Sequence, residues 1–166
     1  DQVNEVLSAG QASTLALAGS TEAAQFQPSD TVRRAQRIID EDHEKLHEIS
    51  RRIRAAKDMA SLAEALEELN ATLVEHFAHE EHPQGLFAIL GTRSPKERQA
   101  FAEILGEHES LLSTARELLS RARADEGGHA ALAAQAAMLA RILGDHERRE
   151  SQVTQAILGP RPVALV

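Results

Sequence analysis

The chain has 166 residues, a formal net charge of −8 at pH 7 and no cysteine. The acidic balance argues against a nucleic-acid partner, because phosphate binding needs a basic face, and the lack of cysteine excludes thiolate metal sites, iron–sulfur clusters and disulfides. No apolar run approaches the roughly 20 residues of a membrane span and no signal-peptide pattern is visible, so we expect a cytoplasmic protein without membrane contact.

Residues 1–28 form an N-terminal segment that is low in charge and rich in Ala, Ser, Gln and Thr. Its apolar residues recur only weakly at helical spacing, which is compatible with a short helix that packs on the main body. We consider this segment a candidate contact for a partner protein or for a second copy of the chain. Ser29 or Asp30 then provides a helix N-cap.

Four long helices are predicted in the rest of the chain, because Ala and Leu dominate and apolar residues recur at helical spacing. The expected helices span residues 31–57, 62–80, 95–124 and 129–158, with a short apolar segment at 86–90. The short turns between them favour an all-α, up-down-up-down antiparallel four-helix bundle over residues 29–158, followed by a C-terminal tail at 159–166. Basic clusters such as Arg51-Arg52 and Arg148-Arg149 alternate with acidic residues, which predicts solvated helix faces with ion pairs.

The second and fourth helices each carry an apolar stripe that leads into a histidine and a glutamate four residues apart. In the second helix this stripe consists of Leu62, Leu66, Leu69, Leu73, His76 and Glu80. In the fourth helix it consists of Leu132, Gln135, Leu139, Ile142, His146 and Glu150. Burying an imidazole and a carboxylate is costly unless something neutralises them, so two such core-facing pairs predict a metal site.

One histidine on each helix is expected in a single layer of the bundle. His43 lies roughly 15 residues before the turn between the first and second helices, and His76 lies roughly 17 residues after it. Each residue of a helix adds about 1.5 Å in height. Counted from the last turn, His108 and His146 lie roughly 18 and 19 residues away, so all four fall within about one helical turn in height. A lone histidine followed by His-x-x-x-Glu thus occurs twice, which suits two metal ions bridged by two carboxylates.

Imidazole and carboxylate ligands without sulfur suit iron, manganese or zinc. Six converging groups exceed the four ligands of a structural zinc site and fit a dinuclear centre better. A ferritin-like centre would instead need two Glu-x-x-His pairs and two further glutamates, and only Glu44-x-x-His47 has that form on a core helix. The ferritin-like interpretation is therefore the weaker one.

The order and spacing of the six candidate ligands resemble the hemerythrin-like (HHE cation-binding) family over residues 30–158. These ligands are His43, His76, Glu80, His108, His146 and Glu150. The resemblance implies two iron ions with an oxo or hydroxo bridge in a left-handed four-helix bundle, with Glu80 and Glu150 bridging the ions and the histidines as terminal ligands. Zinc and manganese are substitutes that the same ligands accept. Family members bind dioxygen, sense oxygen, nitric oxide or iron, or handle peroxide.

Two departures from the oxygen-carrying hemerythrins are visible. Those proteins have a second histidine four residues after the one on the third helix, where this chain has Leu112. They also end in His-x-x-x-x-Asp, whereas this chain has His-x-x-x-Glu at residues 146–150. The pattern is closer to that of bacterial hemerythrin-like proteins and of iron-sensing or cluster-repair members.

Four residues beside the candidate ligands are candidates for further metal ligands or for groups that orient an imidazole. They are His47, His79, Glu81 and Glu147. His47 is expected to be a half-exposed flanking residue, and His79 is a candidate to replace the ligand missing on the third helix. Glu81 and Glu147, like Asp42, are expected at the surface or hydrogen-bonded to a ligand. Five apolar residues are expected in the core, where they could also wall a dry pocket for a diatomic ligand: Phe77, Phe101, Leu105, Leu112 and Ile142.

We therefore expect a hemerythrin-like, non-haem di-iron protein that binds or senses a small oxidant, namely dioxygen, nitric oxide or peroxide, in oxidative or nitrosative stress. One alternative is an enzyme of the peroxidase or catalase type, or one that handles iron in cluster repair or iron storage. Another alternative is an interaction module that a metal merely stabilises. No catalytic residue is assigned, and the absence of Tyr and Trp argues against radical chemistry.

Overall fold

The computed structural model describes residues 28–91 and 94–159. Its helices, in chain order, are α1 (Asp30–Ala55), α2 (Met59–Glu81), α3 (Leu86–Leu90), α4 (Pro95–Arg123) and α5 (His129–Leu158). The N-terminal segment predicted at residues 1–28 lies outside the described residues apart from Pro28, and so does the predicted tail at 159–166 apart from Gly159.

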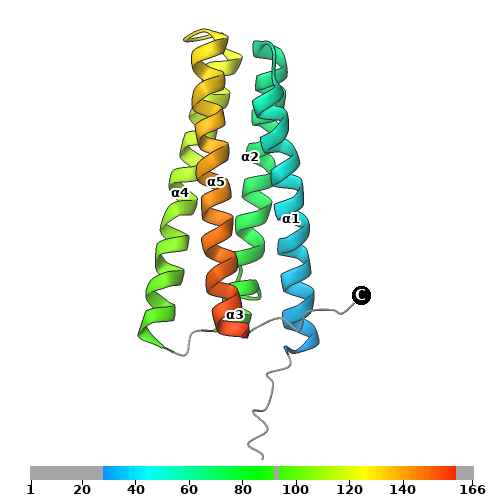
Figure 1. Cartoon of the computed structure of the whole chain (residues 1–166), viewed down its shortest axis with the longest axis vertical. Helices are drawn as coiled ribbons and strands as arrows, with labels where there is room; N and C mark the ends of the chain where they lie inside the picture. Colours follow the sequence, from blue (N-terminus) through cyan, green and yellow to red (C-terminus); the bar gives the residue numbers. More distant parts are fainter. Residues whose placement is uncertain (1–27, 92–93, 160–166) are drawn as a thin grey trace, which may run out of the picture.

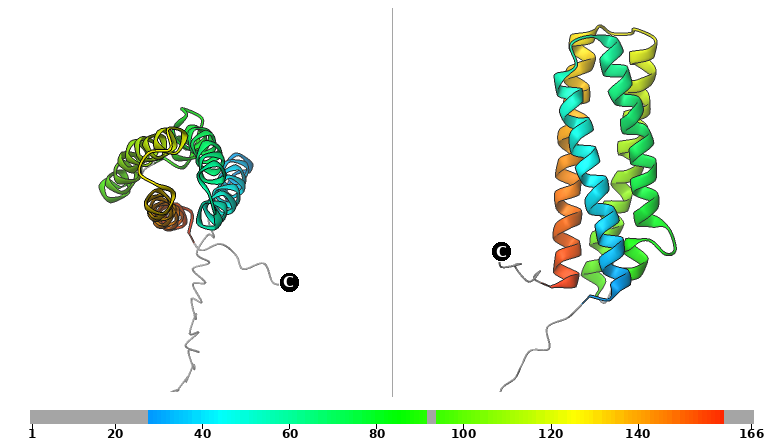
Figure 2. Two further views of the ribbon diagram at one scale, coloured as in Figure 1. Left: turned by 90° about the horizontal axis from the view of Figure 1, so that it is seen from above. Right: turned by 90° about the vertical axis from the view of Figure 1, so that its right-hand side faces the viewer.

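The four long helices pack as an antiparallel bundle, which confirms the predicted all-α four-helix fold (Figure 1). Viewed along the bundle axis, the helices follow one another in the ring order α1, α2, α4, α5 (Figure 2). The short helix α3 packs on α1 and α2 at the end of the bundle remote from the α1–α2 and α4–α5 turns. None of the helices in the described ranges is long and apolar enough to cross a membrane.

Side-chain caps determine where the first two helices begin. The Ser29 hydroxyl accepts a hydrogen bond from the backbone N–H of Val32 and starts α1, as predicted. Asp58 and Ser61 form a capping box, in which each side chain accepts a hydrogen bond from the backbone N–H of the other residue. Because this box ends the α1–α2 turn at once, α2 begins at Met59 and the predicted start at residue 62 is wrong.

The apolar core is divided into two clusters of buried side chains. The larger cluster lies toward the α1–α2 and α4–α5 turns and includes Leu46, Leu66 and Leu139. The smaller cluster lies at the α3 end and includes Ile39 and Phe101. A layer of polar side chains separates the two clusters, and this layer contains the candidate ligands.

Three residues that the sequence placed in the core are exposed instead. Leu105 on α4 and Ile142 on α5 have exposed fractions of 39% and 46%, and Gln135 is also exposed. The buried positions on α5 are Ala136 and Leu143, one residue further along the helix. Because consecutive helical residues are about 100° apart, that shift turns a core position toward solvent. The prediction of Leu105 and Ile142 as core residues is therefore wrong.

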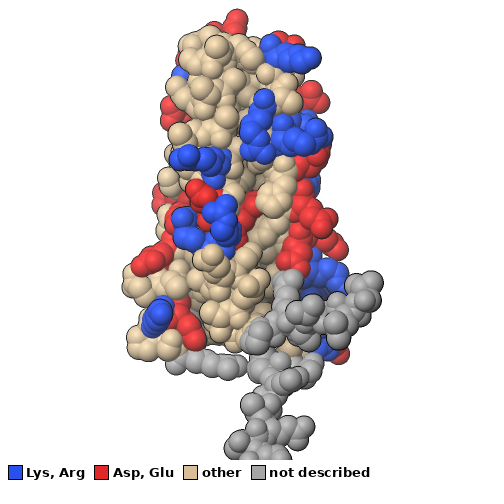
Figure 3. Space-filling view, viewed as in Figure 1, with Lys and Arg blue, Asp and Glu red and all other residues tan. Residues whose placement is uncertain are grey.

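Basic and acidic side chains are interspersed on the surface of the bundle (Figure 3). Arg51 lies 2.6 Å from Glu48, and Arg148 lies 2.7 Å from Asp145, each pair being three residues apart on one helix. The predicted ion-paired, solvated helix faces are thus confirmed at these pairs. Exposed ion pairs contribute only about 0–1 kcal/mol each, so the surface charges have little influence on the choice of fold.

Candidate metal centre

The polar layer brings the six predicted ligands together from all four long helices. α1 contributes His43, α2 contributes His76 and Glu80, α4 contributes His108, and α5 contributes His146 and Glu150. All are buried except His43, whose side chain is 12% exposed. The i, i+4 spacing of each His–Glu pair puts both side chains on the same helix face, which explains how one apolar stripe delivers two ligands.

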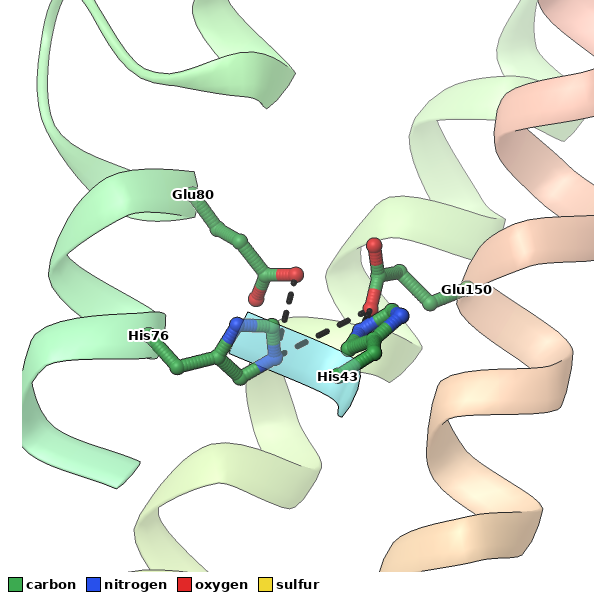
Figure 4. A group of neighbouring side chains, drawn as sticks. All are labelled: His43, His76, Glu80 and Glu150. Carbon is green, nitrogen blue, oxygen red and sulfur yellow. Dashed lines mark hydrogen bonds and ion pairs between the residues drawn. The ribbon is translucent and has the colours of Figure 1, made fainter. Parts of the chain in front are cut away.

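The first group of ligand atoms lies between α1, α2 and α5 (Figure 4). One ligand atom from each of His43, His76, Glu80 and Glu150 lies within 4.8 Å of the others. The Nε2 atom of His76 is 3.5 Å from Glu80 Oε1 and 4.0 Å from Glu150 Oε2. The Nε2 atom of His43 is 3.0 Å from the same Glu150 oxygen. Two imidazoles and two carboxylates therefore face one small volume.

The second group consists of Glu80, His108 and His146, again with ligand atoms within 4.8 Å of one another. Glu80 belongs to both groups, because its Oε1 faces His76 while its Oε2 lies 3.2 Å from His108 Nε2. A carboxylate with one oxygen toward each group has the arrangement that a bridging ligand needs. The two groups of candidate ligands therefore share Glu80.

Several of these atoms are buried without a hydrogen-bond partner. They are both ring nitrogens of His76, both carboxylate oxygens of Glu80, and the Nε2 atoms of His108 and His146. An unsatisfied buried polar group costs roughly 1–3 kcal/mol, and a charged one costs more. Metal cations would satisfy these atoms, except His76 Nδ1, which faces Asp42 at 3.6 Å, so the residues present fit a metal centre.

Carboxylates outside the layer hold the other nitrogen of the buried imidazoles. The Nδ1 atom of His108 lies 2.5 Å from Glu81, and the Nδ1 atom of His146 lies 2.8 Å from Glu107. A carboxylate that accepts the Nδ1 proton leaves Nε2 free as a ligand and fixes the orientation of the ring. Glu81 was a candidate for this position, whereas Glu107 was missed.

An internal repeat in the sequence could have indicated Glu107. It directly precedes the lone histidine of α4, as Asp42 directly precedes the lone histidine of α1. Each of these carboxylates faces the histidine of the following long helix, Asp42 at 3.6 Å from His76 Nδ1 and Glu107 at 2.8 Å from His146 Nδ1. The repeated unit thus includes a carboxylate as well as the ligands.

Electrostatics within the layer differ between the two glutamates. Burial, together with the negative charge of Glu150, raises the pKa of Glu80 well above its ordinary value. Burial also acts to raise the pKa of Glu150, but the hydrogen bond from His43 and the nearby imidazoles outweigh it, so this pKa is lowered. Without metal, Glu80 is therefore the carboxyl group of the pair that holds a proton more readily, and metal binding must displace that proton.

The surroundings of three buried histidines favour the neutral form of the imidazole. Burial lowers the pKa of His76, His108 and His146 below the ordinary value. A neutral imidazole has the free lone pair that a metal ion requires. His43 differs, because contact with Glu150 outweighs its burial and raises its pKa.

The predicted candidate ligand His79 lies outside the layer. The side chain of His79 is 45% exposed and its Nδ1 lies 2.7 Å from Asp42, so the structure does not bring it to the position of the missing ligand on α4. That position is occupied by Leu112, which is half-buried against the larger apolar cluster. A spacing of three residues places His79 about 60° around the helix from His76, and the side chain lies at the exposed edge of that face.

The two predicted phenylalanines have different surroundings. Phe77 is buried in the larger cluster and stacks on the His108 ring with 3.8 Å between ring centroids. Phe101 belongs to the smaller cluster and packs on Phe87 with 4.6 Å between centroids. Of the two phenylalanines, Phe77 is therefore the one that contacts a candidate metal ligand, His108.

Gly85, in the connection between α2 and α3, packs against the last turn of α2, which carries Glu80. A Cβ atom at Gly85 would lie 2.6 Å from the backbone carbonyl oxygens of both His79 and Glu80. Because these atoms are backbone, the turn itself would have to move. We expect Gly85→Ala to weaken metal binding by about 10–100-fold, the range seen when the support of a ligand is lost, as measured by metal titration of the purified variant.

Gly106→Ala is the matched control, because Gly106 lies on α4 and no atom lies within 4 Å of its added Cβ. This exposed helical position should gain about 0.5–1 kcal/mol of stability from alanine, with unchanged metal affinity. Equal metal affinities for the two variants would contradict the supporting role of Gly85.

A family model described as the hemerythrin HHE cation binding domain matches residues 34–158, which is most of the chain. Comparisons with curated proteins and with solved structures found no match. The matched range contains every ligand of the layer.

Proposed function

Because the chain belongs to the hemerythrin HHE cation-binding family, we propose that it is a non-haem di-iron protein that binds or senses a small oxidant, such as dioxygen, nitric oxide or peroxide. The observation that carries this proposal is the position of Glu80, whose two oxygens face separate groups of histidines. A single structural ion needs no buried carboxylate whose two oxygens face separate groups of ligands. A pair of redox-active ions would use such a carboxylate as a common ligand.

In this proposal the ligand set is divided evenly between two iron ions. His43 and His76 would hold one ion, and His108 and His146 would hold the other. Glu80, which faces both groups, and Glu150 would supply the carboxylate ligands. A pair of iron ions would supply electrons to a small ligand and open coordination positions for it.

The remaining residues of the layer position the ligands and exclude water. Glu81 and Glu107 hold the Nδ1 protons of His108 and His146, so that Nε2 of each ring faces the centre. Phe77 covers one face of the His108 ring. The two apolar clusters close the layer from both ends of the bundle, which keeps bulk water away from the charged carboxylates and strengthens their hold on a cation.

Metal analysis combined with absorption spectroscopy tests the proposal. The protein is loaded with Fe(II) without oxygen, its iron content is measured, and spectra are recorded before and after exposure to air or nitric oxide. We expect two irons per chain and new charge-transfer bands in the near-ultraviolet and visible region. One zinc ion or no metal, with no spectral response after iron loading, would overturn the proposal and leave the metal-stabilised module. Peroxide turnover faster than that of free iron would favour the enzymatic alternative.

A further inference from the structure

His47 and Glu147 form a second His–Glu pair beside the metal layer, on the side where α1 faces α5. The Nε2 atom of His47 lies 2.6 Å from Glu147 Oε2. The next pair along the same two helices is His43 with Glu150, at 3.0 Å within the layer. Two pairs of ligand-type side chains, one helical turn apart, therefore follow one another toward the centre.

Exposure decreases steeply along this path. The His47 side chain is 67% exposed, whereas the side chain of its partner Glu147 is 5% exposed. The His43 side chain is 12% exposed and that of Glu150 only 1%. An ion that contacts His47 from solvent would thus have a carboxylate or an imidazole beside it at each step inward.

The burial of Glu147 is not explained by the contacts it makes. Both of its carboxylate oxygens are buried, and Oε2 pairs with the Nε2 atom of His47. Glu81 and Glu107 each orient a buried ligand, but the partner of Glu147 is an exposed histidine. An ion pair with an exposed group contributes only about 0–1 kcal/mol, which is less than the penalty of several kcal/mol for burying a charge. A cation that binds transiently at this position would explain why the carboxylate of Glu147 is buried.

The internal repeat of the chain provides a comparison within the same molecule. The first unit consists of α1 and α2, and the second consists of α4 and α5. The residue four positions after the lone histidine is His47 in the first unit and Leu112 in the second. The residue directly after the histidine of the His-x-x-x-Glu motif is Phe77 in the first unit and Glu147 in the second. The α4 side of the layer is therefore lined by Leu112 and by the ring of Phe77 stacked on His108, whereas the α1 side carries a histidine and a carboxylate.

We propose that His47 and Glu147 form a capture site, where a divalent cation binds first before it passes to the buried centre. This inference rests on the proposed function, because it needs a metal centre to fill. The capture site is a kinetic device: it lowers the barrier for uptake and for release alike. It changes neither the number of ions held at equilibrium nor the affinity for them.

The rate of metal uptake tests this inference. Co²⁺ is mixed with the metal-free full chain in a stopped-flow instrument, and binding is followed by the visible absorption of the bound ion. Release is followed after addition of EDTA. In His47→Gln and in Glu147→Gln we expect both rates to fall by about tenfold, because each substitution removes one of the two groups that bind the arriving ion, and loss of one supporting group typically weakens metal binding by about 10–100-fold. The final stoichiometry should equal that of the unmodified chain in both variants, and in His47→Gln, which removes no carboxylate, the dissociation constant should be unchanged as well.

Glu44→Gln is the matched control, since it removes an exposed carboxylate on the same part of α1 without touching the pair. Its uptake rate should stay within about twofold of the unmodified chain if ligation rather than general attraction is decisive. Equal rates in all proteins would overturn the capture site while leaving the di-iron centre intact. A loss of bound metal in Glu147→Gln would also overturn it, because Glu147 would then be a resident ligand. Failure of the unmodified chain to bind Co²⁺ at all would instead count against the proposed function.

Discussion

Replacement of His76 by alanine is expected to abolish stoichiometric metal binding. The side chain of His76 is completely buried, and its Nε2 lies within 4.0 Å of oxygens from both glutamates. Its loss removes a ligand from the first group and leaves Glu80 and Glu150 without the imidazole that faces both of them. Measurement of iron or zinc per chain after loading and gel filtration tests this expectation.

His82→Ala controls for the loss of a histidine from the same part of the chain. His82 is the exposed C-cap residue of α2, and its Nδ1 accepts a hydrogen bond from the backbone N–H of Gln84. We expect this variant to retain its metal. Two metal ions per chain in His76→Ala would show that the layer is not the binding site.

Glu80→Gln is expected to have opposite effects on the metal-free and metal-loaded proteins. In the metal-free form at pH 8, we expect the variant to be more stable than the unmodified chain by an amount on the order of 1–3 kcal/mol, because a buried carboxyl group that is costly to ionise is replaced by a neutral amide. With metal present at about a thousandfold excess over its dissociation constant, binding stabilises the unmodified chain by about 4 kcal/mol. The variant lacks the shared ligand and should lose most of this gain.

The stability difference between the two metal-free proteins is expected to depend on pH. The folded-state pKa of Glu80 is raised above the ordinary value of 4.5, so the folded metal-free protein holds this proton more tightly than the unfolded chain does. The stability that Glu80 contributes is complete below pH 4.5 and is lost as the pH rises through the raised pKa. Urea unfolding in EDTA at several pH values should therefore show a stability difference that grows from acid toward alkaline pH. A variant that is less stable at pH 8 without metal would contradict this account.

The ligand layer could be predicted from the sequence because helix phase and height are local properties. His76 and Glu80 continue the stripe of buried leucines on α2, and the length of each hairpin sets the height of its histidines. The phase of α5 was harder to predict. Its sequence around Gln135 and Ile142 also contains Ala136 and Leu143, so two adjacent stripes are nearly equally apolar and only packing against the other helices chooses between them.

Contacts between helices explain the residues that the sequence did not reveal. Glu107 holds His146 across the α4–α5 interface, and nothing in the α4 sequence alone distinguishes it from the exposed glutamates around it. Glu147 was expected at the surface or beside a ligand, and its burial depends on the approach of α1 with His47. Which carboxylate faces a neighbouring helix depends on the rotation of both helices, and spacing within one helix does not determine this.

The division of the core by the polar layer has a consequence for cooperativity. Local opening of a protein follows regions of continuous apolar contact, and here the smaller cluster with α3 is separated from the larger one. Ions held by all four long helices would join these two regions into one unfolding unit. In the metal-free chain the α3 end would open by itself, exchanging its amide hydrogens while the rest of the bundle stays closed. The connection of the two halves would then depend on iron supply.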